Sequence, residues 1–289
     1  MQELEFKLST GVRLAAHAYG DPEHPPVILS HGGGQTRHSW GATAETLSRQ
    51  GWYAVAYDHR GHGNSSWSKD GDYYIDRFVE DQRELASLFT REPVLVGASL
   101  GGISAMLAQG ERNQAVFRAI VLVDIVPRMN MEGASNIIRF MGAHMDEGFA
   151  DLEEAADVIA QYTGRPRRKD ISGLSKNLRL DENGRYRWHW DPSFVNQDHT
   201  KQEFTNPNRL EDAVQNISLP MMLVRGQLSD LVTPELAEEF LQLVPHAHCV
   251  DVKNARHMVA GDRNDIFSQA IEDFLGGLGT EQQSTGDPL

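Results

Sequence analysis

The stretch Val94-Leu95-Val96-Gly97-Ala98-Ser99-Leu100-Gly101-Gly102 decides the fold of this chain. It begins as a short apolar run typical of a buried strand, reaches a serine between small residues, and continues into a sequence compatible with a helix. A serine on so sharp a turn projects its hydroxyl out of the sheet, and the crowded turn requires glycine or similarly small neighbours. The stretch therefore predicts a nucleophile elbow with Ser99 at its tip. So short a motif also arises by chance in a chain with 26 glycines. The rest of the sequence must therefore show whether the motif forms a nucleophile elbow.

Length and composition allow one large α/β domain or two smaller ones. The chain has 289 residues, of which 40% are hydrophobic, and this is enough apolar material for a sizeable core. Its single cysteine, Cys249, cannot form an intramolecular disulfide, and the first residues do not show the basic and apolar regions of a secretory signal. We therefore expect a cytoplasmic protein.

Charge and hydropathy exclude two classes of partner. A net charge of −14, from 27 basic and 41 acidic residues, would repel the phosphates of a nucleic acid. No apolar run approaches the roughly 20 residues that a membrane-spanning helix needs. The expected partner is a neutral small-molecule substrate, with no nucleic acid and no membrane, and the sequence does not determine the oligomeric state.

Strand-like and helix-like segments alternate along most of the chain, as in proteins whose helices pack across one sheet. The segment 119–123 is apolar throughout, which suits a strand of a parallel sheet that is buried on both faces. Thr233 and Pro234 are typical of the N-cap and first turn of a helix. We expect strands at 3–8, 13–19, 27–30, 53–57, 94–97, 119–123, 221–225 and 247–252, and helices at 40–50, 75–89, 104–109, 234–243 and 263–275.

The alternation stops between residues 129 and 205, where no convincing strand is found. Apolar residues at helical spacing predict helices at 136–145 and 152–162. The expected domains are therefore an α/β core formed by 1–128 and 206–276, a helical cap at 129–205, and a flexible tail at 277–289. Within the cap, the basic run 165–169 is expected to be a solvated face.

An activated serine needs a histidine as base and a carboxylate that orients this histidine. Asp230 follows the expected strand 221–225, and His257 follows the strand 247–252. The chain order Ser99, Asp230, His257 is the order found when such a triad is built on a serine elbow. In an open parallel sheet the loops that follow the strands meet at the carboxyl edge, so we expect these three residues to form the catalytic group.

The glycines of His31-Gly32-Gly33-Gly34 supply the remaining element of such a site. They follow the expected strand 27–30, and a glycine lets a backbone N–H approach a developing oxyanion closely. We expect the amides of Gly33 and Leu100 to form the oxyanion hole.

These motifs together resemble the α/β-hydrolase superfamily, from about Val12 to Leu275. The resemblance implies a mostly parallel eight-stranded sheet with helices on both faces and a helical cap insertion. Within the superfamily, the sequence is most similar to cap-bearing serine hydrolases of the esterase, haloperoxidase-like and epoxide-hydrolase-like group. Epoxide hydrolases and haloalkane dehalogenases carry aspartate where this chain has Ser99, and this argues against both reactions. Many relatives have glycine before the catalytic histidine, where this chain has Arg256. The matching residues are 31–33, 58–65, 97–101, Asp230 and His257.

Alternatives remain for several residues. Asp124 also ends a buried strand and is a second candidate for the triad acid, although a structural aspartate that caps backbone N–H groups is the interpretation we favour. His59 and His62 lack the cysteines or carboxylates that would complete a metal site, so we expect no metal and no cofactor. The possible substrate pocket consists of Gly34, Phe140, His144, Trp188, Trp190 and Met258, although the aromatic run 186–190 could equally pin the cap to the core.

The sequence thus predicts a serine hydrolase that cleaves a small, largely apolar carboxylic ester through an acyl-enzyme. A carbon–carbon bond hydrolase or a perhydrolase that uses the same triad is the alternative. A non-catalytic receptor for a small molecule is a further alternative, which the complete triad disfavours.

Overall fold

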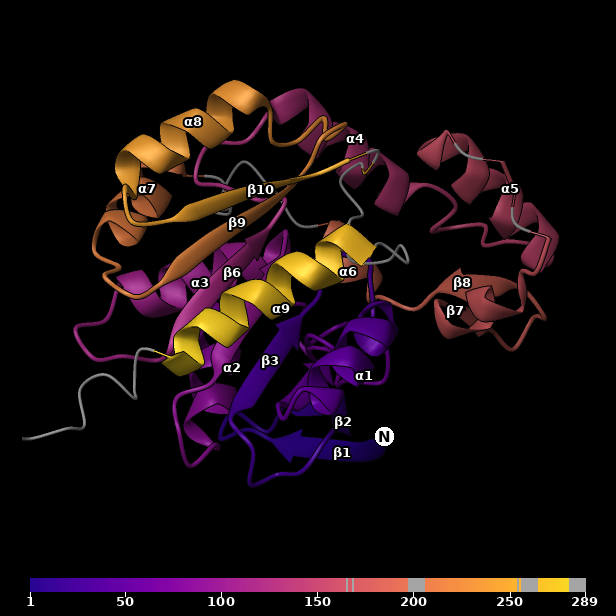
Figure 1. The fold of residues 1–289 in the computed structure, drawn as a ribbon. Helices are drawn as coiled ribbons and strands as arrows, with labels where there is room; N and C mark the ends of the chain where they lie inside the picture. Colours follow the sequence, from indigo (N-terminus) through magenta and orange to yellow (C-terminus); the bar gives the residue numbers. More distant parts are fainter. Residues whose placement is uncertain (165, 168, 197–205, 254, 256–264, 281–289) are drawn as a thin grey trace, which may run out of the picture.

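The computed structural model describes residues 1–164, 166–167, 169–196, 206–253, 255 and 265–280. An eight-stranded sheet with the order β1-β2-β4-β3-β5-β6-β9-β10 forms its centre (Figure 1). β1 and β2 pair antiparallel, β2 pairs antiparallel with β4, and the other neighbours are parallel. The expected eight-stranded, mostly parallel sheet is therefore confirmed. Its strands are β1 (Gln2–Lys7), β2 (Arg13–Tyr19), β3 (Pro26–Ser30), β4 (Tyr53–Tyr57), β5 (Val94–Ala98), β6 (Ala119–Val123), β9 (Met221–Gly226) and β10 (His248–Val252).

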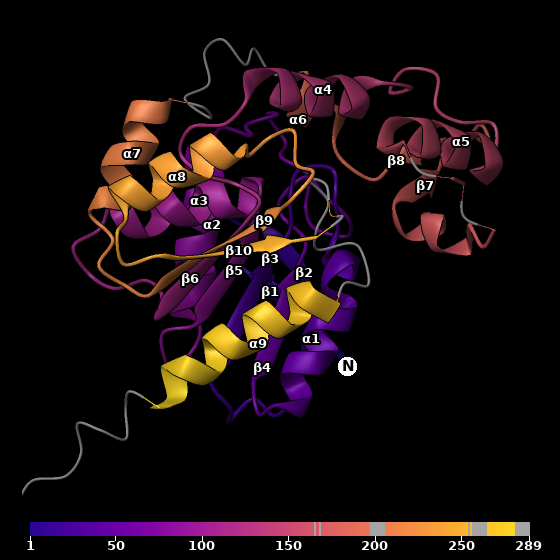
Figure 2. The ribbon, with the colours of Figure 1, turned by 45° about the horizontal axis from the view of Figure 1, so that its top comes forward.

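Helices cover both faces of the sheet (Figure 2). On one face, α1 (Gly41–Arg49) and α9 (Asp265–Thr280) share a core with the side chains of Val27, Val96 and Val121. On the other face, Ile28, Leu95 and Ile120 share a core with residues of α2 (Ile75–Ser87), α3 (Leu100–Gly110), α7 (Pro207–Gln215) and α8 (Pro234–Leu243). The central strands are apolar throughout because successive side chains enter opposite cores.

The ends of two helices illustrate how the sequence sets their limits. Thr233 caps α8 as expected, since its hydroxyl accepts the N–H of Leu236 and Pro234 occupies the first turn. At the other end of the chain, α9 continues to Thr280, beyond the limit of 276 expected for the core. The expected start of the tail at 277 is therefore wrong within the described residues.

The segment between β6 and β9 contains a β-hairpin as well as helices. β7 (Leu178–Leu180) pairs antiparallel with β8 (Tyr186–Trp188), so the expectation of a strand-free insertion is wrong. Each strand has three residues, too few to show an alternating pattern. The helical elements here are α4 (Met131–Gly142), α5 (Leu152–Thr163), the 3-10 turn η2 (Ser172–Lys176) and α6 (Pro192–Val195). In both views, α5 and the hairpin project to one side of the sheet (Figures 1 and 2). We call the described part of 129–205 the cap.

Hydrogen bonds attach the cap to the loop that follows β4. The Asp191 N–H donates to the carbonyl oxygen of Gly61 over 2.8 Å, and the Tyr73 hydroxyl donates to the Asp191 carboxylate over 2.6 Å. The Arg179 guanidinium donates to the carbonyl oxygen of Gly63. The short segment that follows β8 is therefore anchored beside the carboxyl edge of the sheet.

None of the helices in the described ranges combines the length and apolar character needed to cross a membrane.

Candidate active site

Ser99 lies on a strained turn between β5 and α3. Its φ of 45° and ψ of −113° put it in a region that non-glycine residues rarely occupy, and such strain concentrates at functional positions. The Ser99 carbonyl accepts the N–H of Ile103 over 2.9 Å, while the Ser99 N–H donates to the Val123 carbonyl over 3.3 Å. The elbow is thus held by the helix that follows it and by the neighbouring strand β6.

The glycines around Ser99 are required by close packing. A Cβ on Gly97 would lie 2.7 Å from the carbonyl carbon of Gly101, and a Cβ on Gly101 would lie 2.5 Å from the carbonyl oxygen of Ser30. Neither position has room for a side chain, because the clashing atoms belong to the backbone. This crowding is the physical reason for the motif from which the elbow was predicted.

The glycine loop after β3 lies beside the elbow. A Cβ on Gly32 would be 3.2 Å from the Ser99 Cβ, and Gly34 has a φ of +73°, which favours glycine. The Gly33 N–H has no hydrogen-bond acceptor among the residues that the structure describes. Leu100 begins α3, and the first N–H groups of a helix lack an acceptor within the helix. The two amides predicted to form the oxyanion hole therefore come from segments that meet at Ser99.

A buried polar network lies behind this loop. The Ser30 hydroxyl lies 3.0 Å from the Tyr57 hydroxyl and 3.1 Å from His59 Nε2, and it also accepts the side-chain amide of Gln82. The same amide of Gln82 donates to the carbonyl oxygen of Gly101 over 3.0 Å. The network therefore connects β3 and α2 with the first turn of the helix that follows Ser99.

The loop 58–65 folds around two buried ion pairs. The Asp58 carboxylate accepts the N–H groups of Arg37 and Asn64 and pairs with the Arg37 guanidinium. Arg60 forms a two-pronged pair with Asp81 on α2 over 2.7 and 2.6 Å. Buried charges of this kind need full pairing, which both carboxylates obtain here.

Three buried histidines of the core pack together, His31 after β3 and His59 and His62 within this loop. The ring centroids of His31 and His59 lie 4.6 Å apart, and those of His31 and His62 lie 5.3 Å apart. Burial lowers the pKa of His31 to about 4 and that of His62 to about 3, and it holds the pKa of His59 well below its usual value. All three are therefore neutral at pH 7. Among the described residues, no three histidine, cysteine or carboxylate side chains are grouped so that they would hold a metal ion.

Two carboxylates follow β6 and β9, and their surroundings differ. Asp124 is fully buried with a φ of 51°, and its carboxylate accepts the N–H of Gly226 over 3.0 Å and the hydroxyl of Ser229 over 2.6 Å. Asp230 is exposed, one residue beyond Ser229. Asp124 thus accepts a backbone N–H at the end of β9, as the favoured interpretation of a structural, capping aspartate expects. Like Ser99, it also has a positive φ.

His257 and Met258 lie outside the described residues, but the start of their loop is described. The N–H of Leu228 donates to the carbonyl oxygen of Ala255 over 2.9 Å, and the N–H of Gln227 donates to that of Val252 over 3.0 Å. Ala255 is two residues before His257, and Leu228 is two residues before Asp230. The loops that carry the predicted base and the predicted acid therefore start side by side.

The aromatic residues predicted to line the pocket pack against other residues of the cap. Trp188 and Trp190 are 6% and 2% exposed and stack with their ring centroids 4.7 Å apart. Phe140 stacks on Tyr162 over 3.9 Å, and His144 stacks on Phe149 over 4.9 Å. These contacts pack the cap elements against one another.

Two residues that sequence reasoning missed lie close to the glycine loop. A Cβ on Gly33 would be 3.5 Å from the Phe194 ring and 3.8 Å from the Met141 methyl group, and one on Gly34 would be 3.2 Å from that methyl group. Met141 belongs to α4 and Phe194 to α6. Their apolar character was visible in the sequence, but no local signal places a cap residue over a loop more than 100 residues away.

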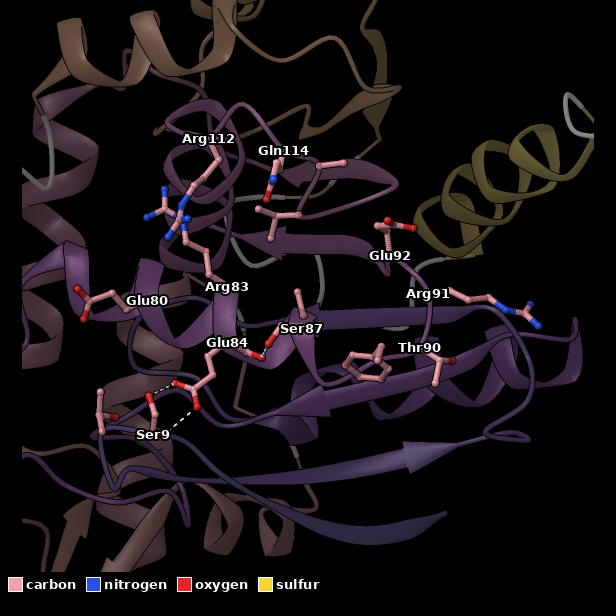
Figure 3. Close-up of a pocket in the computed structure, with 15 residues that line it drawn as sticks. Ser9, Glu80, Arg83, Glu84, Ser87, Thr90, Arg91, Glu92, Arg112 and Gln114 are labelled. Carbon is pink, nitrogen blue, oxygen red and sulfur yellow. Dashed lines mark hydrogen bonds between the residues drawn. The ribbon is translucent and has the colours of Figure 1, made fainter.

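A separate open pocket lies at the opposite end of the sheet (Figure 3). It has a volume of about 590 Å³. Glu92 and Val116, which line it, precede β5 and β6, whereas Ser99 and Asp124 follow these strands. Figure 3 shows Ser9 bonded to Glu84 beside this pocket. This hollow therefore takes no part in the site at the carboxyl edge.

Comparison with known proteins agrees with this geometry. The model of the alpha/beta hydrolase family matches residues 27–270. The esterase Rv0045c of Mycobacterium tuberculosis is 30% identical over 258 residues, which cover 87% of this chain and 83% of the esterase. A 3-hydroxybutyrate-oligomer hydrolase of Cupriavidus necator is 25% identical over 256 residues, covering 85% of this chain and 87% of that protein.

Solved structures show the same fold. An alpha/beta hydrolase of Novosphingobium aromaticivorans superimposes with a TM-score of 0.79 at 24% identity, covering 95% of this chain and 98% of its own. A crystal structure of the Mycobacterium tuberculosis esterase gives a TM-score of 0.69 at 26% identity, with 95% and 91% covered. The chain therefore belongs to the alpha/beta hydrolase family, as a hydrolase that resembles carboxylesterases.

Proposed function

We propose that this protein hydrolyses a small, largely apolar carboxylic ester through an acyl-enzyme on Ser99. The observation that carries the proposal is the elbow itself, where a serine with a φ of 45° lies beside the Gly32 backbone. Strain at a non-glycine residue persists only where the surrounding structure enforces it, as the packing around Gly97 and Gly101 does here. The names of two relatives, an esterase and a 3-hydroxybutyrate-oligomer hydrolase, support a hydrolytic reaction of this class.

In the proposed mechanism, His257 accepts the proton of Ser99 as the hydroxyl oxygen attacks the ester carbonyl. The amides of Gly33 and Leu100 donate hydrogen bonds to the resulting oxyanion. His257 then gives its proton to the departing alcohol, and a water molecule repeats the sequence on the acyl-enzyme and releases the acid. Each oxyanion donor of this kind contributes about 3 kcal/mol to the stability of the transition state.

The carboxylate that orients His257 is proposed to be Asp230, because its loop begins beside that of His257. Asp124 is the second candidate, and its burial and strained backbone support it. The Asp124 contacts to Gly226 and Ser229 equally suit a residue that fixes the loop of Asp230. Separate substitution of the two carboxylates decides between them.

The proposed preference for an apolar substrate follows from the residues nearest to Gly33. Met141 and Phe194 provide a thioether and an aromatic ring beside the loop, and neither carries a charge. An acyl group whose carbonyl oxygen meets the Gly33 amide would contact these side chains, which favours alkyl or aryl groups over charged ones.

The test is labelling and turnover of the wild-type protein and Ser99→Ala. A fluorophosphonate probe is expected to label Ser99 in the wild type, and p-nitrophenyl esters of increasing acyl length are expected to be hydrolysed. Ser99→Ala should lose both reactions while it keeps the wild-type melting temperature. Full ester hydrolysis by Ser99→Ala, or a wild-type protein that is neither labelled nor active on any acyl length, would overturn the proposal.

A further inference from the structure

Three consecutive peptide groups of the glycine loop are each held by a different histidine ring. The carbonyl of Gly32 lies 2.7 Å from His31 Nδ1, the N–H of Gly34 donates to His62 Nε2 over 3.1 Å, and the carbonyl of Gly34 lies 3.2 Å from His189 Nε2. The first of these peptide groups contains the Gly33 N–H, which is the proposed oxyanion donor. A run of glycines has the greatest backbone freedom, so its geometry depends on such outside contacts.

The third histidine differs from the other two in its origin. His31 and His62 belong to the core, whereas His189 follows β8 in the cap. His189 is 2% exposed, and burial together with His62 and His31 holds its pKa well below the usual value. It is therefore a neutral ring that reaches from the cap into the core.

The contacts of His189 determine which of its nitrogens carries the proton. The Gly63 N–H donates to His189 Nδ1 over 2.9 Å, so Nδ1 is the acceptor and Nε2 carries the hydrogen. That hydrogen points at the carbonyl of Gly34. Both nitrogens are thus occupied, one by the loop 58–65 and the other by the glycine loop.

We propose that His189 is a positioning residue through which the cap sets the geometry of the oxyanion hole. It does so by fixing the peptide group after Gly34, while His31 and His62 fix the two groups before it. The inference rests on the proposed function, since it assigns a role to the Gly33 amide in that reaction. It gives the cap a part in the chemical step, in addition to any part in substrate selection.

A matched pair of amide substitutions separates the two contacts of the ring. In His189→Gln the side-chain amide extends to about the position of Nε2 and can still donate to Gly34. In His189→Asn the shorter side chain can accept from Gly63, as Nδ1 does, but does not reach Gly34. His189→Phe keeps the ring shape and removes both contacts.

We expect His189→Asn and His189→Phe to lose about tenfold to hundredfold in kcat with KM changed little, because misplaced groups weaken transition-state binding selectively. His189→Gln should recover most of kcat.

A control variant loosens the cap without touching the glycine loop. Tyr73→Phe removes the hydrogen bond from Tyr73 to the Asp191 carboxylate, which anchors the same segment of the cap. Its kcat should stay within about twofold of the wild type. If Tyr73→Phe lowers kcat as much as His189→Asn does, or if His189→Gln recovers nothing, His189 acts only as a cap anchor and the proposal is wrong.

A second measurement keeps this test independent of ester hydrolysis. Hydrogen–deuterium exchange of the peptide that contains residues 31–36 should be faster in His189→Asn and His189→Phe than in the wild type, and close to the wild type in His189→Gln. If the wild type shows no Ser99-dependent turnover, the proposed function fails while the exchange result still reports on the loop. Unchanged exchange in all three variants contradicts the role of His189 whatever the activity.

Discussion

The hydroxyl of Ser229 donates a hydrogen bond of 2.6 Å to the buried carboxylate of Asp124. The same hydroxyl accepts the N–H groups of Leu231 and Val232, each over 3.1 Å. Asp230 therefore sits in a loop that Asp124 holds through a single serine. This arrangement links the two candidate acids, so that a change at Asp124 also affects the position of Asp230.

The two candidate acids give opposite kinetic expectations. With Asp230 as the acid, Asp230→Asn should lower kcat by about 10³- to 10⁴-fold, because the histidine is no longer held in the productive tautomer. Its melting temperature should change little, since the side chain is exposed. Steady-state kinetics on a p-nitrophenyl ester measure the effect. A loss below tenfold in Asp230→Asn, together with a loss above 10³-fold in Asp124→Asn, would transfer the role to Asp124.

Asp124→Asn is also expected to destabilise the fold. The substitution keeps the shape but replaces one carboxylate oxygen by an NH₂ group, which cannot accept the hydrogen bond from Gly226 or Ser229 that this oxygen receives. Leaving such a buried donor without an acceptor costs about 1–3 kcal/mol. Urea unfolding measures the free-energy change. Ser229→Ala is the companion variant, which removes the hydroxyl donor to Asp124 and also the acceptor of the Leu231 and Val232 N–H groups. An Asp124→Asn variant as stable as the wild type would show that the hydrogen bonds of Asp124 do not contribute to the free energy of unfolding.

Gly101→Ala is expected to prevent or severely weaken folding of the elbow. The new Cβ would meet the backbone oxygen of Ser30 at 2.5 Å, and overpacking of a buried position typically costs about 1–3 kcal/mol or more. Gly173→Ala is the matched control, because no atom lies within 4 Å of its Cβ position and its φ is not positive. Thermal unfolding of both variants compares the two costs. Equal melting temperatures would contradict the packing argument.

The buried histidines make stability depend on pH in a defined direction. His31 and His62 have folded pKa values of about 4 and about 3, below the usual 6.5. Between the folded pKa of each histidine and pH 6.5, the unfolded chain therefore binds more protons than the folded chain. Their contribution is fully present above pH 6.5 and is lost as the pH falls toward the folded values. Each histidine adds a slope of about 1.36 kcal/mol per pH unit within that window.

Urea unfolding at pH 7.0, 6.0 and 5.0 measures this slope. The free energy of unfolding should decrease as the pH falls, and His62→Gln should show a shallower decrease than the wild type. A stability that rises between pH 7.0 and 5.0 would contradict the neutral state of the buried rings.

Shortening the side chains beside Gly33 is expected to change acyl-length preference. Phe194→Ala and Met141→Ala both remove apolar atoms near the glycine loop. We expect the highest kcat/KM in a p-nitrophenyl ester series to move to longer or bulkier acyl groups. The ratio of kcat/KM between neighbouring members of the series should change by a factor of about 10. Leu180→Ala is a suitable control, because Leu180 is exposed on β7. An unchanged optimum in both variants would remove Met141 and Phe194 from the acyl site.

The sheet and its elbow were predictable because their signals are local. Apolar runs mark the central strands, and the small residues that surround Ser99 stand next to it in the sequence, although one of them, Gly101, is required by a contact with Ser30 on β3. The hairpin β7–β8 was missed because each strand is only three residues long. His189 could not be found in this way, since its partner Gly34 is 155 residues away and the contact exists only in the folded chain. Contacts between cap and core depend on how separate elements dock, which a pattern in one segment does not encode.

The parallel pairing of β5 with β6 has a further consequence for how this chain can vary. Ala98 is paired with Val123, so Ser99 and Asp124 leave the sheet from equivalent positions. A residue inserted into either strand would turn every following side chain to the opposite face. Apolar substitutions are therefore tolerated in these two strands, but insertions and deletions are not. The number of residues in each strand determines where Ser99 and Asp124 leave the sheet.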